Sequence, residues 1–145
     1  MASIELLNKM LKLDEGLRLK PYLDTADPPK LTIGIGRNLD DVGISEQEAL
    51  MLLDSDIAKL LVNAHLQRIL NGHDQVRQSV ILNMAFNMGV KGLLKFRNML
   101  SAFEAKDYVT AALEMLDSKW AEQVGDRAIR LAYMMKDGKI HDDYA

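Results

Sequence analysis

Residues 14 to 36 read DEGLRLKPYLDTADPPKLTIGIG and place two acids and a threonine around one predicted hairpin. Glu15 lies where a first amphipathic helix should end, Asp24 follows a strand-like alternation, and Thr32 opens a second strand. Hydrolysis of a glycosidic bond needs one carboxylic acid to protonate the departing oxygen and one carboxylate to activate water or to attack the anomeric carbon. Two acids beside a hairpin are therefore candidates for that chemistry.

The same residues also allow a plainer interpretation. A DEG triplet is an ordinary way to end a helix, and a DT pair is an ordinary way to enter a turn. Because Asp and Glu usually stay in contact with solvent, the residues alone favour a surface position for both acids. Asp14 is expected to be a structural partner for an arginine or a backbone N–H group.

The hairpin follows from the alternation of side chains and from the turn residues. Residues 17 to 23 alternate apolar and polar side chains, and Pro21 confines this strand to the edge of a sheet or to a bulge. The DPP run at 27–29 predicts the turn, and a second alternation covers residues 31 to 35. The glycines of that second run favour a closely approached strand over a phosphate-binding loop, because no helix with the required Lys and Ser or Thr follows.

Apolar residues at helical spacing predict the remaining elements, and capping residues mark their starts. Ser3 can cap the first helix, and Gly16 ends it. Ser45 and Glu48 have the spacing of a capping box, which opens the helix predicted to be the longest. The predicted helices cover residues 3–13, 45–72, 74–86, 93–105, 107–120 and 126–135.

The composition bounds the architecture and the partners. With 145 residues, 48% of them hydrophobic, the chain can bury one substantial core and has the usual size of a single domain. It has no cysteine, so packing and hydrogen bonds must hold the fold. The formal net charge is −3 and no basic stripe is present, which argues against nucleic acid as a partner.

Location and cofactors are constrained by what the sequence lacks. Residues 1–16 do not combine a basic region with an uninterrupted apolar stretch, and no segment approaches the roughly 20 apolar residues of a membrane span. We therefore expect a soluble chain without a signal peptide.

His65, His73 and His141 lack the spacing of a metal-binding motif, so we expect no metal and no cofactor. Methionines of the predicted helices are expected to fill gaps in the core, at positions 84, 88, 99, 115, 134 and 135.

Several motifs together resemble those of the phage-type, T4-like lysozymes. The first block is EG at 15–16 followed by LRLKPYLDT and TIGIG. Further along, in the order of that family, come NMAFNMG at 83–89, FRNML at 96–100, SKW at 118–120 and DRAIRL at 126–131. The motifs cover most of the chain, and the first block is highly specific.

The resemblance implies an α+β, predominantly helical, lysozyme-like fold. A small β-hairpin lobe and a larger helical lobe would be joined by a long helix. The whole chain, 1–145, would then be one muramidase domain. Its small catalytic lobe would cover about 14–58, and its helical lobe about 59–145 together with the N-terminal helix 3–13.

The resemblance also implies an inverting muramidase, which would hydrolyse the β-1,4 bond between N-acetylmuramic acid and N-acetylglucosamine in peptidoglycan. Glu15 would be the general acid, kept protonated by a partly desolvated cleft. Asp24 would stay ionised and, with Thr32, would hold the attacking water on the opposite face of the sugar.

Substrate binding is assigned by the same resemblance to residues of the later motifs. Phe86, Asn87 and Met88 would line the sugar cleft. Arg127 would approach Glu15 and steady its charge.

The sequence departs from the family pattern around the hairpin. Arg37 stands where the family has a histidine, and Asp56 occupies the matching acidic position, so we expect an Arg37–Asp56 pair. The segment between Gly36 and Ser45 is shorter than in the family, which implies a trimmed small lobe. The turn between the two predicted water-holding residues is longer, which could shift the water site.

By resemblance the protein would be a phage endolysin that serves host cell lysis. It would be a monomer, made in the host cytoplasm and acting on peptidoglycan in the periplasm after holin-dependent access. Two alternatives stay open. A lytic transglycosylase would need the acid but no water-holding carboxylate, and a non-catalytic module would only bind the wall or belong to a phage tail.

Overall fold

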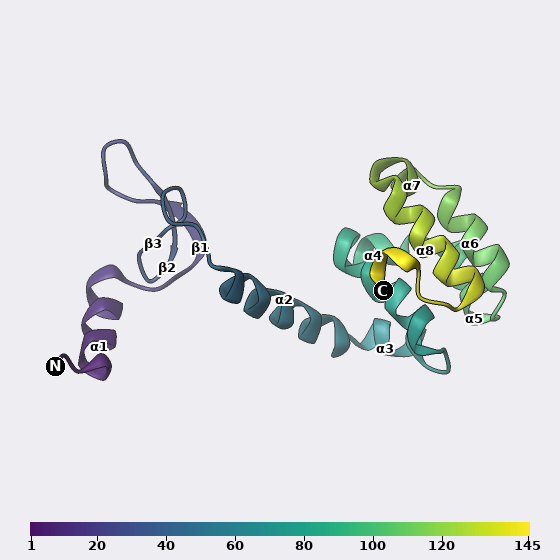
Figure 1. Ribbon diagram of the computed structural model, residues 1–145, viewed down its shortest axis with the longest axis horizontal. Coiled ribbons are helices and arrows are strands. Elements are labelled where there is room, and N and C mark those ends of the chain that lie inside the picture. Colours follow the sequence, from purple (N-terminus) through teal and green to yellow (C-terminus); the bar gives the residue numbers. More distant parts are fainter. The chain divides into compact units, whose positions relative to one another are not determined.

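The computed structural model describes residues 1–145 and is mostly helical with one small antiparallel sheet (Figure 1), which confirms the predicted α+β class. The strands are β1 (Arg18–Leu23), β2 (Leu31–Gly34) and β3 (Arg37–Asn38). The helices are α1 (Ile4–Glu15), α2 (Glu46–Leu61), α3 (Ala64–Leu70), α4 (Gln75–Leu94), α5 (Arg97–Glu104), α6 (Tyr108–Leu116), α7 (Lys119–Val124) and α8 (Asp126–Asp137), and a 3-10 turn follows at Asp142–Tyr144. The chain forms two compact units, unit 1 (Met1–Leu52) and unit 2 (Leu53–Ala145), and the boundary between them falls within α2.

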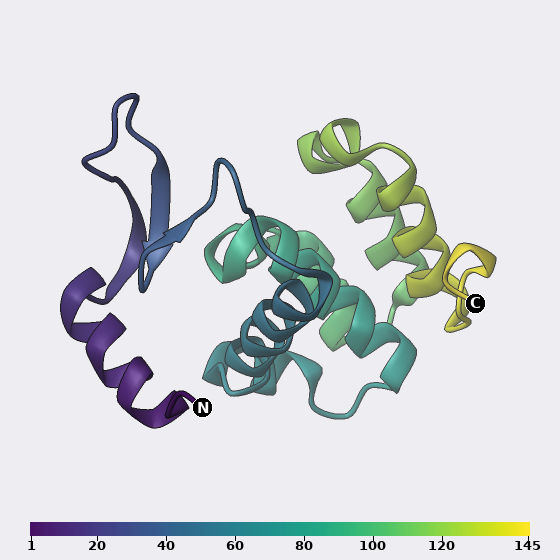
Figure 2. The same ribbon diagram turned by 60° about the vertical axis from the view of Figure 1, so that its left-hand side comes forward.

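The first helix begins and ends as the sequence predicts, within two residues. The Ser3 hydroxyl accepts the N–H of Leu6 at 3.3 Å, which caps α1. Gly16 ends the helix with a φ of 78°, and its N–H donates to the Lys12 carbonyl at 3.1 Å. The chain therefore turns from α1 into β1 directly after Glu15 (Figure 2).

The sheet has β2 at its centre, with β1 and β3 paired antiparallel on either side. The register of β1 against β2 shifts between Arg18 and Tyr22, the stretch that contains Pro21. The predicted confinement of Pro21 to an edge strand or a bulge is confirmed, because a proline has no N–H to give to a ladder. The sequence does not predict β3, since two residues are too short to show an alternation.

The capping box at the start of α2 is confirmed in both directions. The Glu48 N–H donates to the Ser45 hydroxyl at 3.1 Å, and the Ser45 N–H donates to the Glu48 carboxylate at 2.9 Å. The predicted extent of this helix to residue 72 is wrong, because α2 ends at Leu61. Asn63 then accepts the N–H of Leu66 at 3.1 Å and caps the separate helix α3.

The longest helix is α4, and Asp74 caps it as predicted by accepting the N–H of Arg77 at 3.0 Å. The predicted end at Phe86 is too early. The helix continues to Leu94 across a kink at Gly89, where φ is 80° and ψ is 159°. Gly89 therefore ends one helical run of α4, and a second run follows it directly.

The predicted helix 107–120 is divided in two. Asp107 caps α6 as expected, by accepting the N–H of Thr110 at 3.2 Å. The Ser118 hydroxyl donates to the Met115 carbonyl at 2.6 Å and accepts the N–H of Ala121 at 3.1 Å. One serine side chain therefore joins the end of α6 to the start of α7, and a helical pattern alone does not show the break.

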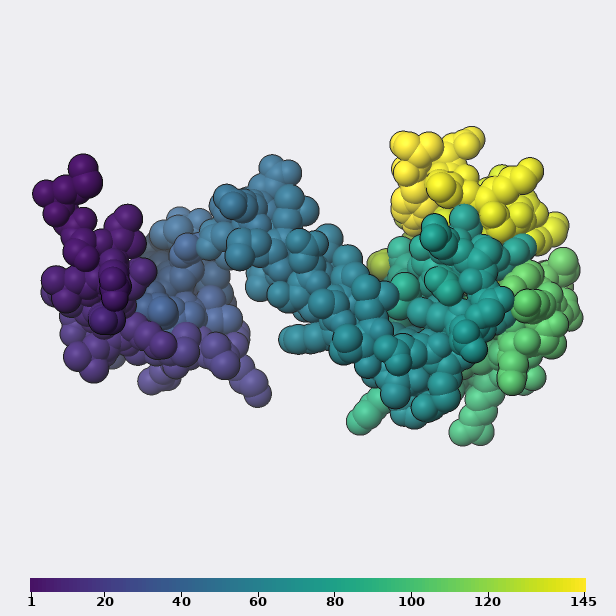
Figure 3. Space-filling model, turned by 90° about the horizontal axis from the view of Figure 1, so that it is seen from below, coloured from purple at the N-terminus to yellow at the C-terminus, as the bar shows by residue number.

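The apolar core lies in unit 2, which the space-filling view shows as a closely packed body coloured teal to yellow (Figure 3). Five of the six methionines expected in the core are buried, and Met88 is half-buried against it. No helix combines the length and the apolar character needed to cross a membrane. The buried apolar residues are Leu66, Leu70, Val80, Ile81, Met84, Ala85, Leu93, Met99, Phe103, Ala111, Ala112, Met115, Trp120, Ala128, Leu131, Ala132, Met134 and Met135.

Arg77 ties the start of α4 to the end of α8. Its Nε donates to the Met135 carbonyl at 2.7 Å, and its Nη2 donates to the Lys136 carbonyl at 2.9 Å. The third nitrogen donates to Asp74 at 3.0 Å, and the guanidinium lies 3.7 Å from the centre of the Tyr108 ring. Because the last carbonyls of a helix have no partner within it, this arginine completes the C-terminus of α8.

Candidate active site

Glu15 is the last residue of α1, and its side chain lies against Gly36 at the end of the TIGIG motif. A Cβ atom at Gly36 would stand 2.8 Å from Oε2 of Glu15 and 3.0 Å from its Cδ. Gly36 also has a φ of +67°, a conformation that costs a residue with a Cβ atom energy. The backbone conformation favours glycine here, and the missing Cβ leaves room for the carboxyl group of Glu15.

Asp24 follows β1 and closes the loop that leads to β2. Its Oδ1 accepts the N–H of Ala26 at 3.0 Å and the N–H of Lys30 at 2.8 Å. In return the Asp24 N–H donates to the Lys30 carbonyl at 2.9 Å. The second carboxylate oxygen, Oδ2, has no hydrogen-bond donor within the hairpin, so it is available to a ligand.

Thr32 lies on the central strand and is the buried residue of unit 1, with 3% of its surface exposed. Its hydroxyl donates to the Lys30 carbonyl at 2.9 Å. Since that bond uses the hydroxyl hydrogen, the oxygen keeps its lone pairs for accepting hydrogen bonds.

Asp24 and Thr32 are thus brought together through one residue, Lys30, whose backbone binds both. A carboxylate oxygen and a hydroxyl oxygen, both acceptors, suit a water molecule that has two hydrogens to donate. The sequence does not identify Lys30 as a positioning residue, because its backbone rather than its side chain does the work.

Arg37 binds Glu48, and this corrects the pairing with Asp56 that the sequence suggested. Its two terminal nitrogens each lie 2.9 Å from a Glu48 oxygen, and one also donates to the Gly43 carbonyl at 3.2 Å. Glu48 is already held by the capping box, which places its carboxylate one turn into α2 and in reach of β3. The capping-box spacing could have signalled this, because it fixes a carboxylate that a nearby arginine can use.

The contacts of Glu48 lower its pKa to about 2. The hydrogen bond from Arg37 is the largest cause, followed by the hydrogen bond from the Ser45 N–H. The same pair raises the pKa of Arg37. The link between β3 and the start of α2 therefore depends on an ionised carboxylate.

In unit 2, two of the four predicted sugar-binding residues line one pocket. Phe86 and Arg127 meet there with Asn83, in a space of about 310 Å³ whose other walls are mainly apolar. Nε and Nη2 of Arg127 donate to the Asn83 side-chain oxygen at 3.0 and 2.8 Å. Asn83 is a residue of the pocket that the sequence did not single out, although it opens the NMAFNMG motif. The approach of Arg127 to Glu15 stays a prediction.

Asn87 and Met88 lie outside that pocket lining. The Asn87 side-chain oxygen accepts the indole N–H of Trp120 at 2.8 Å, which ties α4 to α7. Met88 packs beside Gly92, where an added Cβ would come within 3.0 Å of its Cγ. The contacts within unit 2 therefore give these two residues structural partners, and their binding roles stay predictions.

Comparison with known proteins places these residues within one family. Residues 12–132 match the family described as phage lysozyme, and this span contains every predicted site residue. Two proteins of Dictyostelium discoideum, probable T4-type lysozymes 1 and 2, are 30% and 29% identical to this chain in alignments of 165 and 166 positions. These alignments cover 93% and 94% of this chain and 96% of each relative.

A longer relative is the pre-baseplate central spike protein Gp5 of Enterobacteria phage T4, which is 32% identical in an alignment of 165 positions. The alignment covers 91% of this chain but only 28% of that protein. The match over residues 12–132 agrees with the helical architecture and with the order of the motifs along the chain. The chain therefore belongs to the phage lysozyme family, whose members are hydrolases of the bacterial cell wall.

Proposed function

We propose that this protein is a muramidase that hydrolyses the β-1,4 bond between N-acetylmuramic acid and N-acetylglucosamine with inversion at the anomeric carbon. Glu15 gives its proton to the glycosidic oxygen as the bond to the anomeric carbon breaks. A water held by Asp24 and Thr32 attacks the opposite face of that carbon. Asp24 takes a proton from this water, and exchange with solvent then restores both carboxyl groups.

The proposal rests above all on the hydrogen bonds of Asp24 and Thr32. Both residues are fixed to the backbone of Lys30, yet each keeps an oxygen that can accept from a water. The hydroxyl of Thr32 gives its hydrogen to a carbonyl, so it can only act as an acceptor toward that water. Proximity of this kind accounts for a large share of catalysis, because water and sugar are held in reacting geometry.

The general acid is tested by replacing Glu15 with Gln, which conserves shape but cannot donate the acidic proton. Clearing of a peptidoglycan suspension should slow by at least about 100-fold, the lower range for general acid catalysis. The free energy of unfolding should not fall, since Glu15 makes no hydrogen bond within unit 1 that Gln would break. Undiminished clearing by the folded variant would remove Glu15 from the mechanism.

Product analysis tests the reaction type and the stereochemistry. Mass spectrometry of the released ends should show reducing muramic acid, whereas the anhydro form would identify a lytic transglycosylase and an intact wall a binding module. Proton NMR of the first product from a soluble β-linked oligomer should show the α anomer. A first-formed β anomer would indicate retention and would overturn the assigned role of Asp24.

The biological setting proposed is host cell lysis by a phage endolysin. In this proposal the protein is a monomer, made in the host cytoplasm, which reaches the periplasm with the help of a holin. The second candidate is a lysozyme module of a phage tail, which is favoured by the similarity to the T4 central spike protein. Proteomics of purified particles separates the two, because a tail module stays in the virion and an endolysin is left in the lysate.

A further inference from the structure

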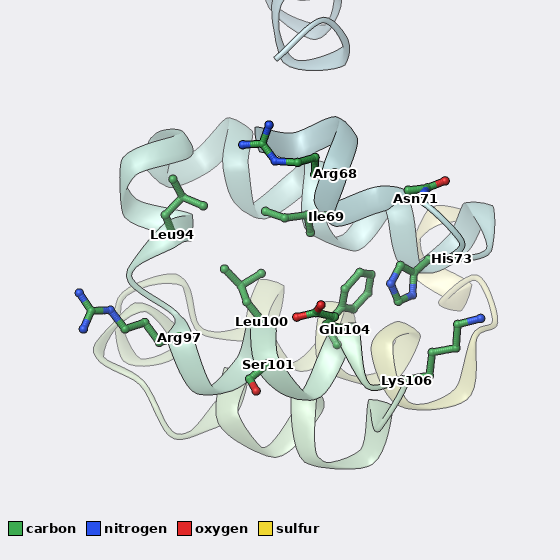
Figure 4. A pocket seen from close by; sticks show the side chains of 11 residues that line it. Arg68, Ile69, Asn71, His73, Leu94, Arg97, Leu100, Ser101, Glu104 and Lys106 are labelled. Carbon is green, nitrogen blue, oxygen red and sulfur yellow. The ribbon is translucent and has the colours of Figure 1, made fainter. Parts of the chain in front are cut away.

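A pocket of unit 2 lies between α3 and α5 (Figure 4), and none of the predicted sugar-binding residues lines it. Its volume is about 570 Å³. Neither Phe86 nor Arg127 lines it, so the proposed cleavage leaves this pocket without a role. Small-molecule sites have volumes of roughly 300 to 1,000 Å³, and this space falls within that range.

The pocket is positively charged although the chain is acidic. Arg68, Arg97 and Lys106 line it, with Glu104 as the only acid among the lining residues. None of these four side chains forms an ion pair. The pocket thus has three cations against one anion, while the whole chain has a net charge of −3. Cations without an acidic partner around a cavity attract an anionic ligand, although one nitrogen of Arg68 already donates to the His65 ring at 3.0 Å.

The walls of the pocket add apolar surface between these charges. Leu100 of α5 faces Ile69 of α3 across it (Figure 4), and Phe103 of α5 is a further apolar lining residue. His73 stacks on Phe103 with 3.8 Å between ring centres. Burial, followed by the charge of Lys106, lowers the pKa of His73. The lowered pKa favours the neutral imidazole, which stacks its ring face on Phe103.

We propose that this pocket binds a short acidic peptide that carries several carboxylates and one free ammonium group. In Figure 4, Arg97 and Lys106 lie at opposite ends of the pocket and the Glu104 carboxylate lies between them. Carboxylates toward the ends of the ligand would meet the cations, an ammonium near its middle would meet Glu104, and small apolar side chains would contact Leu100 and Ile69. A phosphodiester polymer has the negative charge but offers no ammonium to Glu104.

For a cell-wall hydrolase the peptide stems of peptidoglycan have this chemistry. A tetrapeptide stem built with diaminopimelate carries three carboxylates, one ammonium group and the methyl groups of its alanines. Binding of such stems would hold an acidic protein on an acidic wall, where its net charge alone would oppose contact. The identity of the ligand as a wall peptide rests on the proposed function.

The test is a calorimetric and NMR titration of the full chain with N-acetyl-L-Ala-γ-D-Glu-meso-diaminopimelyl-D-Ala at low salt. This peptide has no glycosidic bond, so its binding can fail or succeed independently of cleavage. We expect saturable binding that weakens with salt and perturbs the amide signals of α3 and α5. Absence of saturable binding, or perturbation confined to other elements, would overturn the proposal.

Variants locate the ligand and its ammonium group. Arg68→Gln and Arg97→Gln should each weaken binding about fivefold, as expected for one partly exposed charge pair. Lys91→Gln removes the same charge from an exposed position outside the pocket and should leave the affinity unchanged. Equal weakening by Lys91→Gln would show attraction to net charge alone and would refute the site.

The contact between Glu104 and the ammonium group is tested by a thermodynamic cycle that combines one change in the protein with one change in the ligand. Acetylation of the diaminopimelate amine should weaken binding to the wild type but not to Glu104→Gln. Equal losses in both proteins would remove Glu104 from the site. Poly(glycerol phosphate) should compete poorly with the peptide for the pocket. If it competed equally well at the same concentration of charge, the ligand would be a phosphodiester polymer and the peptide proposal would be overturned.

Discussion

The carboxyl group of Glu15 lies directly against the position at which a side chain at Gly36 would begin. Oε2 of Glu15 lies 2.8 Å from the position that a Cβ of residue 36 would take. The two residues are far apart in sequence, at the end of α1 and just beyond β2. A side chain at position 36 would therefore press on the proposed general acid, and the carboxyl group of Glu15 would have to move.

Replacing Gly36 with alanine should disturb Glu15, and Gly34 provides the matched control. Both glycines have positive φ, +67° and +71°, but a Cβ at Gly34 would meet nothing within 4 Å. Each substitution should reduce the free energy of unfolding by about 1 kcal/mol through backbone strain. Only Gly36→Ala should also displace Glu15 and lower peptidoglycan clearing beyond the loss shown by Gly34→Ala. Similar activity in the two variants would show that the contact has no catalytic consequence.

Two substitutions of Asp24 should distinguish its role in catalysis from its role in holding the loop. Asp24→Asn keeps a side-chain oxygen for the N–H groups of Ala26 and Lys30 but removes the charge, so the loop should persist while hydrolysis falls at least about 100-fold. Asp24→Ala loses both hydrogen bonds and should cost about 2 kcal/mol of stability as well. Chemical denaturation and clearing assays measure the two effects. A stable, fully active Asp24→Asn variant would contradict the proposed role as base.

The Arg37–Glu48 link should make stability depend on acid pH. The folded pKa of Glu48, about 2, lies below its ordinary value of 4.5, so folding favours the ionised carboxylate. Its contribution is therefore complete above about pH 4.5 and is lost as the pH falls toward 2. Glu48→Gln keeps an acceptor for the Ser45 N–H but does not titrate. The melting temperature of the variant should fall less steeply than that of the wild type over this interval, and parallel curves would exclude Glu48 as a source of the dependence.

Arg77 should contribute to stability through geometry as much as through charge. Arg77→Lys keeps the charge but cannot donate in parallel to the carbonyls of Met135 and Lys136, so the free energy of unfolding should fall by about 2 kcal/mol. Arg97→Lys is the control, since the Arg97 side chain makes no hydrogen bond within the protein and its replacement should be nearly neutral. Denaturant unfolding compares them. Equal stability of both variants would mean that the end of α8 does not need the guanidinium.

The sequence correctly predicts those features that depend on interactions between residues close together in the chain. Ser3, Asp74 and Asp107 cap helices because a side-chain oxygen needs only the next turn of the same segment, and the Ser45 capping box forms for the same reason. The edge position of Pro21 likewise follows from a missing N–H. Such features depend on neighbours in sequence, and they are confirmed.

Helix breaks and long-range partners are not local, and the predictions fail or stop there. Asn63 and Ser118 begin new helices inside stretches whose apolar spacing continues unbroken. The spacing therefore predicts one helix where the structure has two. Arg37 could reach more than one acid, and only the folded positions of β3 and α2 select Glu48. For the candidate site, the sequence names Asp24 and Thr32 but not the backbone of Lys30 that joins them, because main-chain groups carry no residue signature.

The way Lys30 joins Asp24 and Thr32 gives the loop before it unusual freedom to change. Both bonds use the N–H and C=O of Lys30, and its side chain instead reaches Asp41 at 3.2 Å. Any residue except proline could therefore serve at position 30, and the stretch 25–29 could be lengthened or replaced provided that Asp24 Oδ1 still finds its two donors. An engineer could graft a binding segment into this loop while keeping the spacing of the two oxygens intact.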